Sequence, residues 1–212
     1  MTPTDLVIIG AGGHGRQLHD LVEAHNAAGG TPYRVLGYLD DRELDDEDRR
    51  RLGAEHLGPV ERLAELDAAF VIGVADPAGR RAIATGSAAR GRAAETLRHP
   101  TAVVGRLTTV GPGAFLSAYA VVDTNVVLGA DVHLNFHSSV GHDSVLGDQV
   151  TVCPGVRISG GVSVGDGVFI GTNAAVVQGL TIGEGVVIGA GAVVRRDVAP
   201  GTTVVGMLGH RP

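Results

Sequence analysis

The chain of 212 residues contains no lysine, no tryptophan and a single cysteine. The absence of lysine excludes Schiff-base chemistry on a side-chain amine and a triphosphate-binding loop that depends on lysine. The lone Cys153 excludes an internal disulfide framework. Aromatic residues make up only 3% of the chain, whereas glycine occurs 33 times. This balance is typical of a narrow solenoid, whose core takes branched aliphatic side chains and whose corners need positive φ angles.

Positive charge and long apolar segments are also scarce. The formal net charge is −6 at pH 7, which argues against nucleic acid or an anionic membrane as a partner. The apolar segment at residues 6–9 is too short for a signal peptide or a membrane-spanning helix. We therefore expect a cytoplasmic protein with neither a membrane nor a nucleic-acid partner.

A six-residue repeat runs through the C-terminal half. Every sixth residue from Val104 to Val194 is Val, Ile or Leu, sixteen times in succession. An α-helix cannot hold this register, because 3.6 residues per turn would spread the repeated position around its whole surface. A chain that turns a corner every six residues and stacks coil upon coil does hold it. The repeat therefore predicts a parallel β-helix in which three hexads form one coil and residues eighteen apart stack.

The N-terminal half has a different pattern, and the two halves meet near His99 and Pro100. We therefore predict a first domain over residues 1–99 and a second over residues 100–212. Expected strands lie at 6–9, 35–39 and 70–74, and expected helices at 15–28, 61–66 and 77–90, with a charged loop or short helix at 42–51. This alternation predicts a small Rossmann-like α/β domain with a parallel sheet. About a hundred residues hold only half of a full dinucleotide-binding fold, which argues against an NAD dehydrogenase.

A glycine-rich segment, Gly-Ala-Gly-Gly-His-Gly at residues 10–15, joins the first expected strand to the first expected helix. Glycine lets backbone approach a phosphate, and a helix N-terminus offers free N–H groups. Asp40 and Asp41 follow the second expected strand and could accept hydrogen bonds from a ribose or a base. The segment therefore predicts nucleotide binding, with a tight turn beside a solvated acidic loop as the alternative. His14 within it suits either a ligand contact or the capping of a nearby carbonyl.

The richest polar cluster of the predicted solenoid occupies residues 135–143 and includes His137, His142 and Asp143. A carboxylate beside an imidazole raises its basicity and fixes its tautomer, which suits a general base. Gly160 lies eighteen residues after His142. Gly160 should therefore stack on His142. Because it has no side chain, it would leave a gap over the imidazole, with its backbone N–H nearby. The alternative is a surface histidine with an unrelated aspartate.

These features together resemble a known family. The repeat resembles the left-handed β-helix of the hexapeptide acyltransferases. The glycine-rich segment, Asp40-Asp41 and the segment Val-Gly-His-Asp-Ser-Val-Leu-Gly-Asp at residues 140–148 are similar to one branch. That branch comprises the sialic-acid O-acetyltransferase-like enzymes and the nucleotide-aminosugar N-acetyltransferases that act on bacillosamine and perosamine. The resemblance covers essentially the whole chain.

The resemblance implies a homotrimer that binds acetyl-CoA between neighbouring solenoids, needs no metal and acetylates a nucleotide-sugar. It implies that His142 is the catalytic base, that Asp143 raises its pKa and that the Gly160 amide holds the oxyanion. The implied nucleotide-sugar contacts are Gly12, Gly13, His14, Asp40, Asp41 and Gly73, and the implied acetyl-CoA contacts are Thr151, Thr172 and Ala190. Thr151 stands where some relatives have a second histidine. The tail at 205–212 lacks the ending common in the family.

The sequence is also compatible with two other functions. The spacing of His137 and His142 resembles the zinc-dependent gamma-class carbonic anhydrases, although no third histidine lies in register. A non-catalytic module is the other possibility, with the first domain sensing a nucleotide and the solenoid serving only to form a trimer. The sequence does not distinguish an amine from a hydroxyl acceptor.

Overall fold

A computed structural model describes residues 2–88 and 92–206. The first domain contains β1 (Thr4–Ile9), α1 (Gly13–Ala27), β2 (Tyr33–Leu39), α2 (Asp46–Leu52), β3 (Glu55–Gly58), the 3₁₀ helix η1 (Val60–Glu65), β4 (Ala69–Ile72) and α3 (Pro77–Ala88). Its four strands form one parallel sheet in the order β3-β2-β1-β4. Leu18 and Leu21 of α1 share a hydrophobic cluster with one side of this sheet, and Ile83 of α3 packs on the other. The expected parallel α/β domain is confirmed.

The elements differ from the sequence pattern in a few places. The segment predicted as a helix at 61–66 forms η1, and α1 begins two residues earlier than expected. Strand β3 was not predicted, because its sequence, Glu-His-Leu-Gly, has only one apolar side chain. The predicted end of the last helix, Arg90, lies outside the described residues.

The second domain is the predicted β-helix, a prism built from three parallel sheets. One sheet, which we call the docked face, contains β5 (Leu97–Arg98), β8 (Phe115–Leu116), β11 (His133–Leu134), β14 (Thr151–Val152), β17 (Phe169–Ile170), β20 (Val187–Ile188) and β22 (Thr203–Val204). The six-stranded face contains β6 (Val103–Val104), β9 (Val121–Val122), β12 (Ser139–Val140), β15 (Arg157–Ile158), β18 (Ala175–Val176) and β21 (Val193–Val194). The five-stranded face contains β7 (Thr109–Val110), β10 (Val127–Leu128), β13 (Val145–Leu146), β16 (Ser163–Val164) and β19 (Thr181–Ile182).

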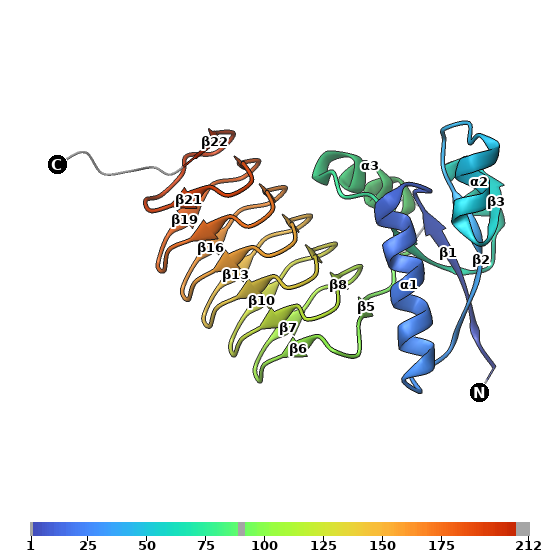
Figure 1. Cartoon of the computed structure of the whole chain (residues 1–212), viewed down its shortest axis with the longest axis horizontal. Coiled ribbons are helices and arrows are strands. Elements are labelled where there is room, and N and C mark those ends of the chain that lie inside the picture. The colour runs from blue at the N-terminus through green and yellow to red at the C-terminus, as the bar shows by residue number, and fades with distance from the viewer. Residues whose placement is uncertain (1, 89–91, 207–212) are drawn as a thin grey trace.

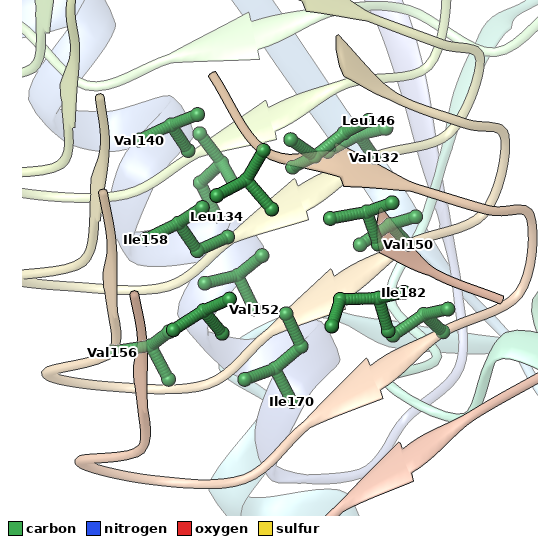
Figure 2. Close-up of a cluster of buried hydrophobic side chains, with 14 of the residues drawn as sticks. Val132, Leu134, Val140, Leu146, Val150, Val152, Val156, Ile158, Ile170 and Ile182 are labelled. Atoms are coloured by element: carbon green, nitrogen blue, oxygen red, sulfur yellow. The ribbon is translucent and has the colours of Figure 1, made fainter. Parts of the chain in front are cut away.

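The repeated aliphatic residues point into the prism, as the register predicts. Leu134, Val152 and Ile170 stack along one face, each eighteen residues from the next, and all three are fully buried. The position four after each marker also turns inward, as Val132 and Val150 do (Figure 2). Two buried positions per hexad thus fill the core with small branched side chains, which explains the scarcity of aromatic residues.

Each corner of the prism holds one residue in the left-handed backbone region. From Leu107 to Gly191 every sixth residue has a positive φ, fifteen in succession, and seven of these are glycine. The others include Asn125, His137 and Asp143. Asn and Asp tolerate this conformation better than most side chains. The corners therefore account for seven of the 33 glycines, and the register fixes which side chains are displayed on them.

The α/β domain lies against the first coils of the docked face (Figure 1). Leu97 and Phe115 of this face belong to the same hydrophobic cluster as Leu18 and Leu21 of α1. Strand β5 pairs with β8 and so belongs to the solenoid. The two domains therefore share a core, and the orientation of one on the other is set by packing.

We predict opposite effects from two Gly→Ala substitutions. Gly185 lies at a corner with φ +65°, Gly86 lies in α3, and a Cβ at either would meet no atom within 4 Å. Gly185→Ala should destabilise the protein by about 1 kcal/mol through left-handed strain. Gly86→Ala should stabilise its helix by about 0.5–1 kcal/mol. Urea unfolding midpoints should therefore move in opposite directions, and a shift of both in one direction contradicts the role given to backbone conformation.

Candidate active site

His142 and Asp143 lie in the turn between β12 and β13, on the edge where the six-stranded and five-stranded faces meet. Nδ1 of His142 is 2.7 Å from Oδ2 of Asp143. The other carboxylate oxygen, Oδ1, accepts a hydrogen bond of 2.7 Å from Nδ2 of Asn125, which occupies the same corner one coil earlier. Asn125 thus holds the carboxylate that orients the imidazole. The side chains of His142 and Asp143 are 60% and 57% exposed, so they project from the solenoid.

Charge and hydrogen bonding shift the pKa of both groups. The hydrogen bond that His142 donates to Asp143, aided by the negative charge of the carboxylate, raises the pKa of His142. The hydrogen bond from Asn125, followed by that from His142, lowers the pKa of Asp143. The carboxylate therefore stays ionised and the imidazole becomes a stronger base. With Nδ1 bonded to Asp143, Nε2 is the nitrogen free to take a proton from a substrate.

Gly160 lies beside the imidazole, as the register predicts. A Cβ at this position would lie 2.6 Å from both Cε1 and Nε2 of His142, so the ring occupies the space that a side chain would need. Within the part of the chain that the structure describes, the backbone N–H of Gly160 donates to no acceptor. A free amide on the residue that faces Nε2 could hold negative charge on a carbonyl oxygen.

The glycine-rich segment lies at the carboxyl edge of the parallel sheet. Gly12 precedes α1, and Gly13 and His14 form its first turn. Gly73 follows β4, on the other side of β1 from β2, so the chain reverses its strand order between β1 and β4. Ligands of open α/β sheets bind in the crevice at such a point. Gly73 also packs against Gly15, since a Cβ on Gly73 would lie 2.5 Å from the Gly15 Cα.

Some of the predicted nucleotide contacts have protein partners. Asp40 accepts hydrogen bonds from the backbone N–H of Ala11, at 2.7 Å, and of Arg42, at 2.9 Å. Oδ1 of Asp41 accepts from the backbone N–H of Val60 at 2.7 Å. These carboxylates therefore also shape the loops at the carboxyl edge of the sheet.

His14 is bonded through both ring nitrogens. Nδ1 is 3.0 Å from Oε1 of Gln17, and Nε2 is 2.9 Å from Nδ1 of His133 on the docked face. Its side chain therefore bridges the two domains, while its backbone N–H remains in the first turn of α1.

The predicted acetyl-CoA contacts fall into two groups. Thr172 and Ala190 are exposed and lie on the edge between the docked and six-stranded faces. Thr151 is buried instead, and its hydroxyl contacts the carbonyl of Ala75 at 2.7 Å and the guanidinium of Arg80 at 2.9 Å. Because this hydroxyl is occupied inside the chain, we leave Thr151 out of the acetyl-CoA contacts proposed below.

One chain does not bring the two halves of the predicted site together. His14 contacts the docked face, whereas His142 lies on the edge opposite that face. The prism therefore separates the glycine-rich segment from the imidazole of the same chain. His137 lies on a different edge from His142 and stacks on Tyr119, with ring centroids 5.1 Å apart. Among residues 2–88 and 92–206, no three His, Cys, Asp or Glu side chains form a group suited to a metal ion.

Three residues of these sites were missed by sequence reasoning. Asn125 could have been found, because it lies eighteen residues before Asp143. His133 directly precedes the marker Leu134, which places it on the outside of the prism but does not reveal that a domain covers it. Arg80 gave no signal, since nothing in a helical pattern shows that its cation is buried.

Comparison with known proteins identifies both domains. A family model described as the PglD N-terminal domain matches residues 5–86. A second, described as bacterial transferase hexapeptide with six repeats, matches residues 161–196.

Solved structures resemble the whole chain. The acetyltransferase domain of PglB from Neisseria gonorrhoeae, in complex with acetyl coenzyme A, is 34% identical over 97% of each chain, with a TM-score of 0.85. PerB from Caulobacter crescentus, in complex with CoA and GDP-perosamine, is 28% identical over 92% of this chain and 91% of its own, with a TM-score of 0.79. The GDP-perosamine N-acetyltransferase of Escherichia coli O157:H7 is 40% identical over 62 residues, a stretch that spans 28% of that relative's length.

The fold is thus that of a hexapeptide-repeat transferase whose left-handed β-helix follows a PglD-type N-terminal domain. The chain belongs to the family of the GDP-perosamine and bacillosamine N-acetyltransferases. In the described part of the chain, no helix combines the length and apolar character needed to cross a bilayer.

We predict that Gly160→Ala displaces the His142 imidazole. The added methyl group would lie 2.6 Å from two ring atoms, so the ring must move away from its hydrogen bond with Asp143. The pKa of His142, measured by NMR titration of its imidazole signal, should fall toward the ordinary histidine value. Gly86→Ala, remote from the site, should leave it unchanged. An unaltered titration in Gly160→Ala would show that the ring does not depend on this glycine.

Proposed function

We propose that this chain transfers an acetyl group from acetyl-CoA to an amine, or to a hydroxyl, of a nucleotide-linked sugar. The observation on which this rests is the His142–Asp143 pair beside the free N–H of Gly160 on an exposed edge of a hexapeptide solenoid. Complexes of two relatives support the ligands, since PglB was solved with acetyl coenzyme A and PerB with CoA and GDP-perosamine. Acetyl-CoA and nucleotide-sugars are metabolites of the cytoplasm, where we expect the protein to act.

The reaction is a direct transfer. Neutral His142 takes a proton at Nε2 as the acceptor nitrogen or oxygen attacks the thioester carbonyl. The new bond to the carbonyl carbon forms first, and the Gly160 N–H stabilises the resulting oxyanion, an interaction typically worth about 3 kcal/mol. The C–S bond then breaks, and the CoA sulfur leaves with the proton from the imidazolium. Cys153 takes no part, because it packs against the solenoid core and burial raises the pKa of its thiol.

The glycine-rich segment would bind the nucleotide end of the acceptor. The backbone N–H groups of Gly12, Gly13 and His14 lie at the positive end of α1, which suits a diphosphate. Gly73 lines the same crevice from β4, and Asp40 and Asp41 stand at the end of β2, within the same edge of the sheet. The CoA arm would run past the exposed turns at Thr172 and Ala190.

A homotrimer would complete this site. Each chain separates its glycine-rich segment from its own His142, so a second copy must supply the other half. The two faces that meet at His142 are not covered by the α/β domain, and they display exposed valines: Val103 (56%), Val121 (41%), Val127 (42%) and Val145 (46%). Apolar side chains on an uncovered sheet are what a subunit interface requires. We therefore place acetyl-CoA and the acceptor between neighbouring solenoids.

Turnover tests the proposed reaction. Wild-type protein should release CoA thiol from acetyl-CoA when given a panel of GDP- and UDP-linked aminosugars, and mass spectrometry should show an acetylated sugar. His142→Ala should lower the rate about a hundredfold to ten-thousandfold, the usual contribution of a general base. Equal rates for both proteins would remove His142 from the reaction. No turnover across the panel would favour a binding module, and zinc-dependent hydration of CO₂ would favour the carbonic anhydrase alternative.

The pH profile of the same reaction reports the base. Because the neutral imidazole is the active form, kcat/KM should rise as pH passes the raised pKa of His142 and level off above it. Asp143→Asn removes the carboxylate that raises this pKa, so the rising limb should move to lower pH while the plateau falls. A limb that stays in place in Asp143→Asn would contradict the pairing.

The oligomeric state provides a separate prediction. Sedimentation should give three times the mass of one chain. Val145→Arg, on the five-stranded face, should dissociate the trimer because it buries a charge in the apolar contact. Val187→Arg is a matched control, since Val187 has a similar exposed fraction, 42%, but lies on the docked face. Dissociation by Val187→Arg alone would place the interface on the docked face instead.

A further inference from the structure

Arg80 of α3 is fully buried between the two domains, and all five of its N–H groups have an acceptor. Two bonds stay within the α/β domain, from Nη1 to the carbonyls of Val74 at 2.9 Å and Ala75 at 3.1 Å. The other three reach the solenoid. Nε donates to the carbonyl of Asp131 at 2.8 Å, and Nη2 donates to the carbonyl of Gln149 at 2.7 Å and to Oγ1 of Thr151 at 2.9 Å.

These acceptors lie at two consecutive coils of the prism. Asp131 and Gln149 are eighteen residues apart and occupy the same corner. The guanidinium therefore spans the step between coils and fixes the height of the α/β domain along the solenoid. Thr151 adds a second link, because its hydroxyl contacts the carbonyl of Ala75 at 2.7 Å. A buried cation without a complete set of partners costs several kcal/mol, so this contact tolerates little displacement.

The carbonyls that Arg80 binds lie next to the proposed nucleotide crevice. Val74 and Ala75 follow Gly73, which packs on Gly15 of the glycine-rich segment. Arg80 thus holds one wall of the crevice to the solenoid. A second anchor holds the other wall, where His14 contacts His133 through its Nε2.

Arg80 and the histidine pair also interact electrostatically. If His14 donates from Nδ1 to Gln17, its Nε2 must accept from Nδ1 of His133, and both rings are neutral. Burial, followed by the positive charge of Arg80, lowers the pKa of His133. Burial also lowers the pKa of His14, where Gln17 acts in the opposite direction and Arg80 adds to the lowering.

Two carboxylates act on the charge of Arg80 itself. Burial lowers the pKa of Arg80 to about 10, and the carboxylates of Asp131 and Asp76 oppose that change. The guanidinium is therefore still charged at neutral pH. Its charge adds to the effect of burial, which is the main reason that the two imidazoles stay neutral and can bond to each other.

We propose that Arg80 is a positioning residue for the acceptor substrate. It fixes the glycine-rich segment on the solenoid at the height where the nucleotide-sugar meets the His142 corner of a neighbouring copy. It acts through the carbonyls after Gly73 and through the His14–His133 contact, and it touches no substrate. This inference rests on the proposed function for its kinetic consequences, whereas its structural consequence can be measured without turnover.

The kinetic test compares two neighbouring arginines. Arg80→Met keeps the volume but removes the five donors. Arg81→Met is the control, because Arg81 is exposed and, among the residues that the structure describes, its polar side-chain contacts are with Gln149 and Glu184 alone. Arg80→Met should lower kcat/KM for the nucleotide-sugar by about tenfold to a hundredfold, the usual effect of a misplaced substrate. Its KM for acetyl-CoA and its trimer mass should stay as in the wild type, and Arg81→Met should change none of these. An equal loss of kcat/KM for the nucleotide-sugar and for acetyl-CoA would show that Arg80 only stabilises the fold, and it would overturn the proposal.

A graded substitution covers the case in which Arg80→Met does not fold. Thr151→Val removes only the hydroxyl that Arg80 and Ala75 share, and Thr151→Ser retains it. Thr151→Val should lower kcat/KM for the nucleotide-sugar without changing the KM for acetyl-CoA, and Thr151→Ser should restore it. An identical nucleotide-sugar kcat/KM in wild type, Thr151→Val and Thr151→Ser would overturn the proposal as well.

An NMR titration separates this inference from the proposed reaction. In wild-type protein labelled with ¹³C at histidine Cε1, the signals of His14 and His133 should not titrate near neutral pH. In Thr151→Val, or in Arg80→Met if it folds, the pKa of at least one of the two imidazoles should be higher than in the wild type, so that its signal titrates. In Arg81→Met neither pKa should change. Unchanged titration in a folded Arg80 or Thr151 variant rejects the coupling, whether or not the protein turns over any acceptor. A protein that shows the coupling but no turnover rejects only the reaction.

Discussion

The hydrogen-bonded register of the solenoid is the constraint on which the rest of the structure depends. From β5 to β21 each strand pairs with the strand eighteen residues away without a slip, and only the last coil is shorter, since β22 pairs with β20 sixteen residues earlier. This register places Gly160 on His142 and Asn125 under Asp143. A catalytic base usually requires a fold that gathers residues distant in sequence. In the proposed site, consecutive coils supply the imidazole, the carboxylate, the asparagine that holds it and the backbone amide, so a structural repeat would position the chemistry.

A second constraint is the attachment of the α/β domain to one face. Phe115, His133 and Thr151 stack along that face and are all buried by the domain. The same attachment leaves the other two faces uncovered and places the glycine-rich segment away from the imidazole of its own chain. In the proposed enzyme, assembly and activity are therefore linked by geometry. A chain that folds perfectly but stays alone has both halves of the proposed site and no means of joining them.

The sequence was most informative where structure repeats. The marker positions, the three-hexad coil and the stacking of Gly160 on His142 all follow from counting, because each coil repeats one local geometry. The contacts between domains could not be found in this way. Arg80 reads as an ordinary helical arginine, His133 as an outward side chain and Thr151 as a ligand contact, since burial at a domain junction depends on how two independent surfaces meet. Asp40 and Asp41 show a milder form of this problem, because loop folding gives their carboxylates backbone partners that the sequence does not reveal.

The buried guanidinium at the junction also bears on the absence of lysine from the chain. An ammonium group at that depth would readily give up its proton, whereas arginine keeps its charge. A deprotonated ammonium group is a free amine, and amines are the nucleophiles that thioesters acylate. A protein that binds acetyl-CoA and contains no lysine has no ε-amine in its side chains that the thioester could acetylate. Bound acetyl-CoA therefore cannot be consumed by acetylation of lysine side chains of the protein itself.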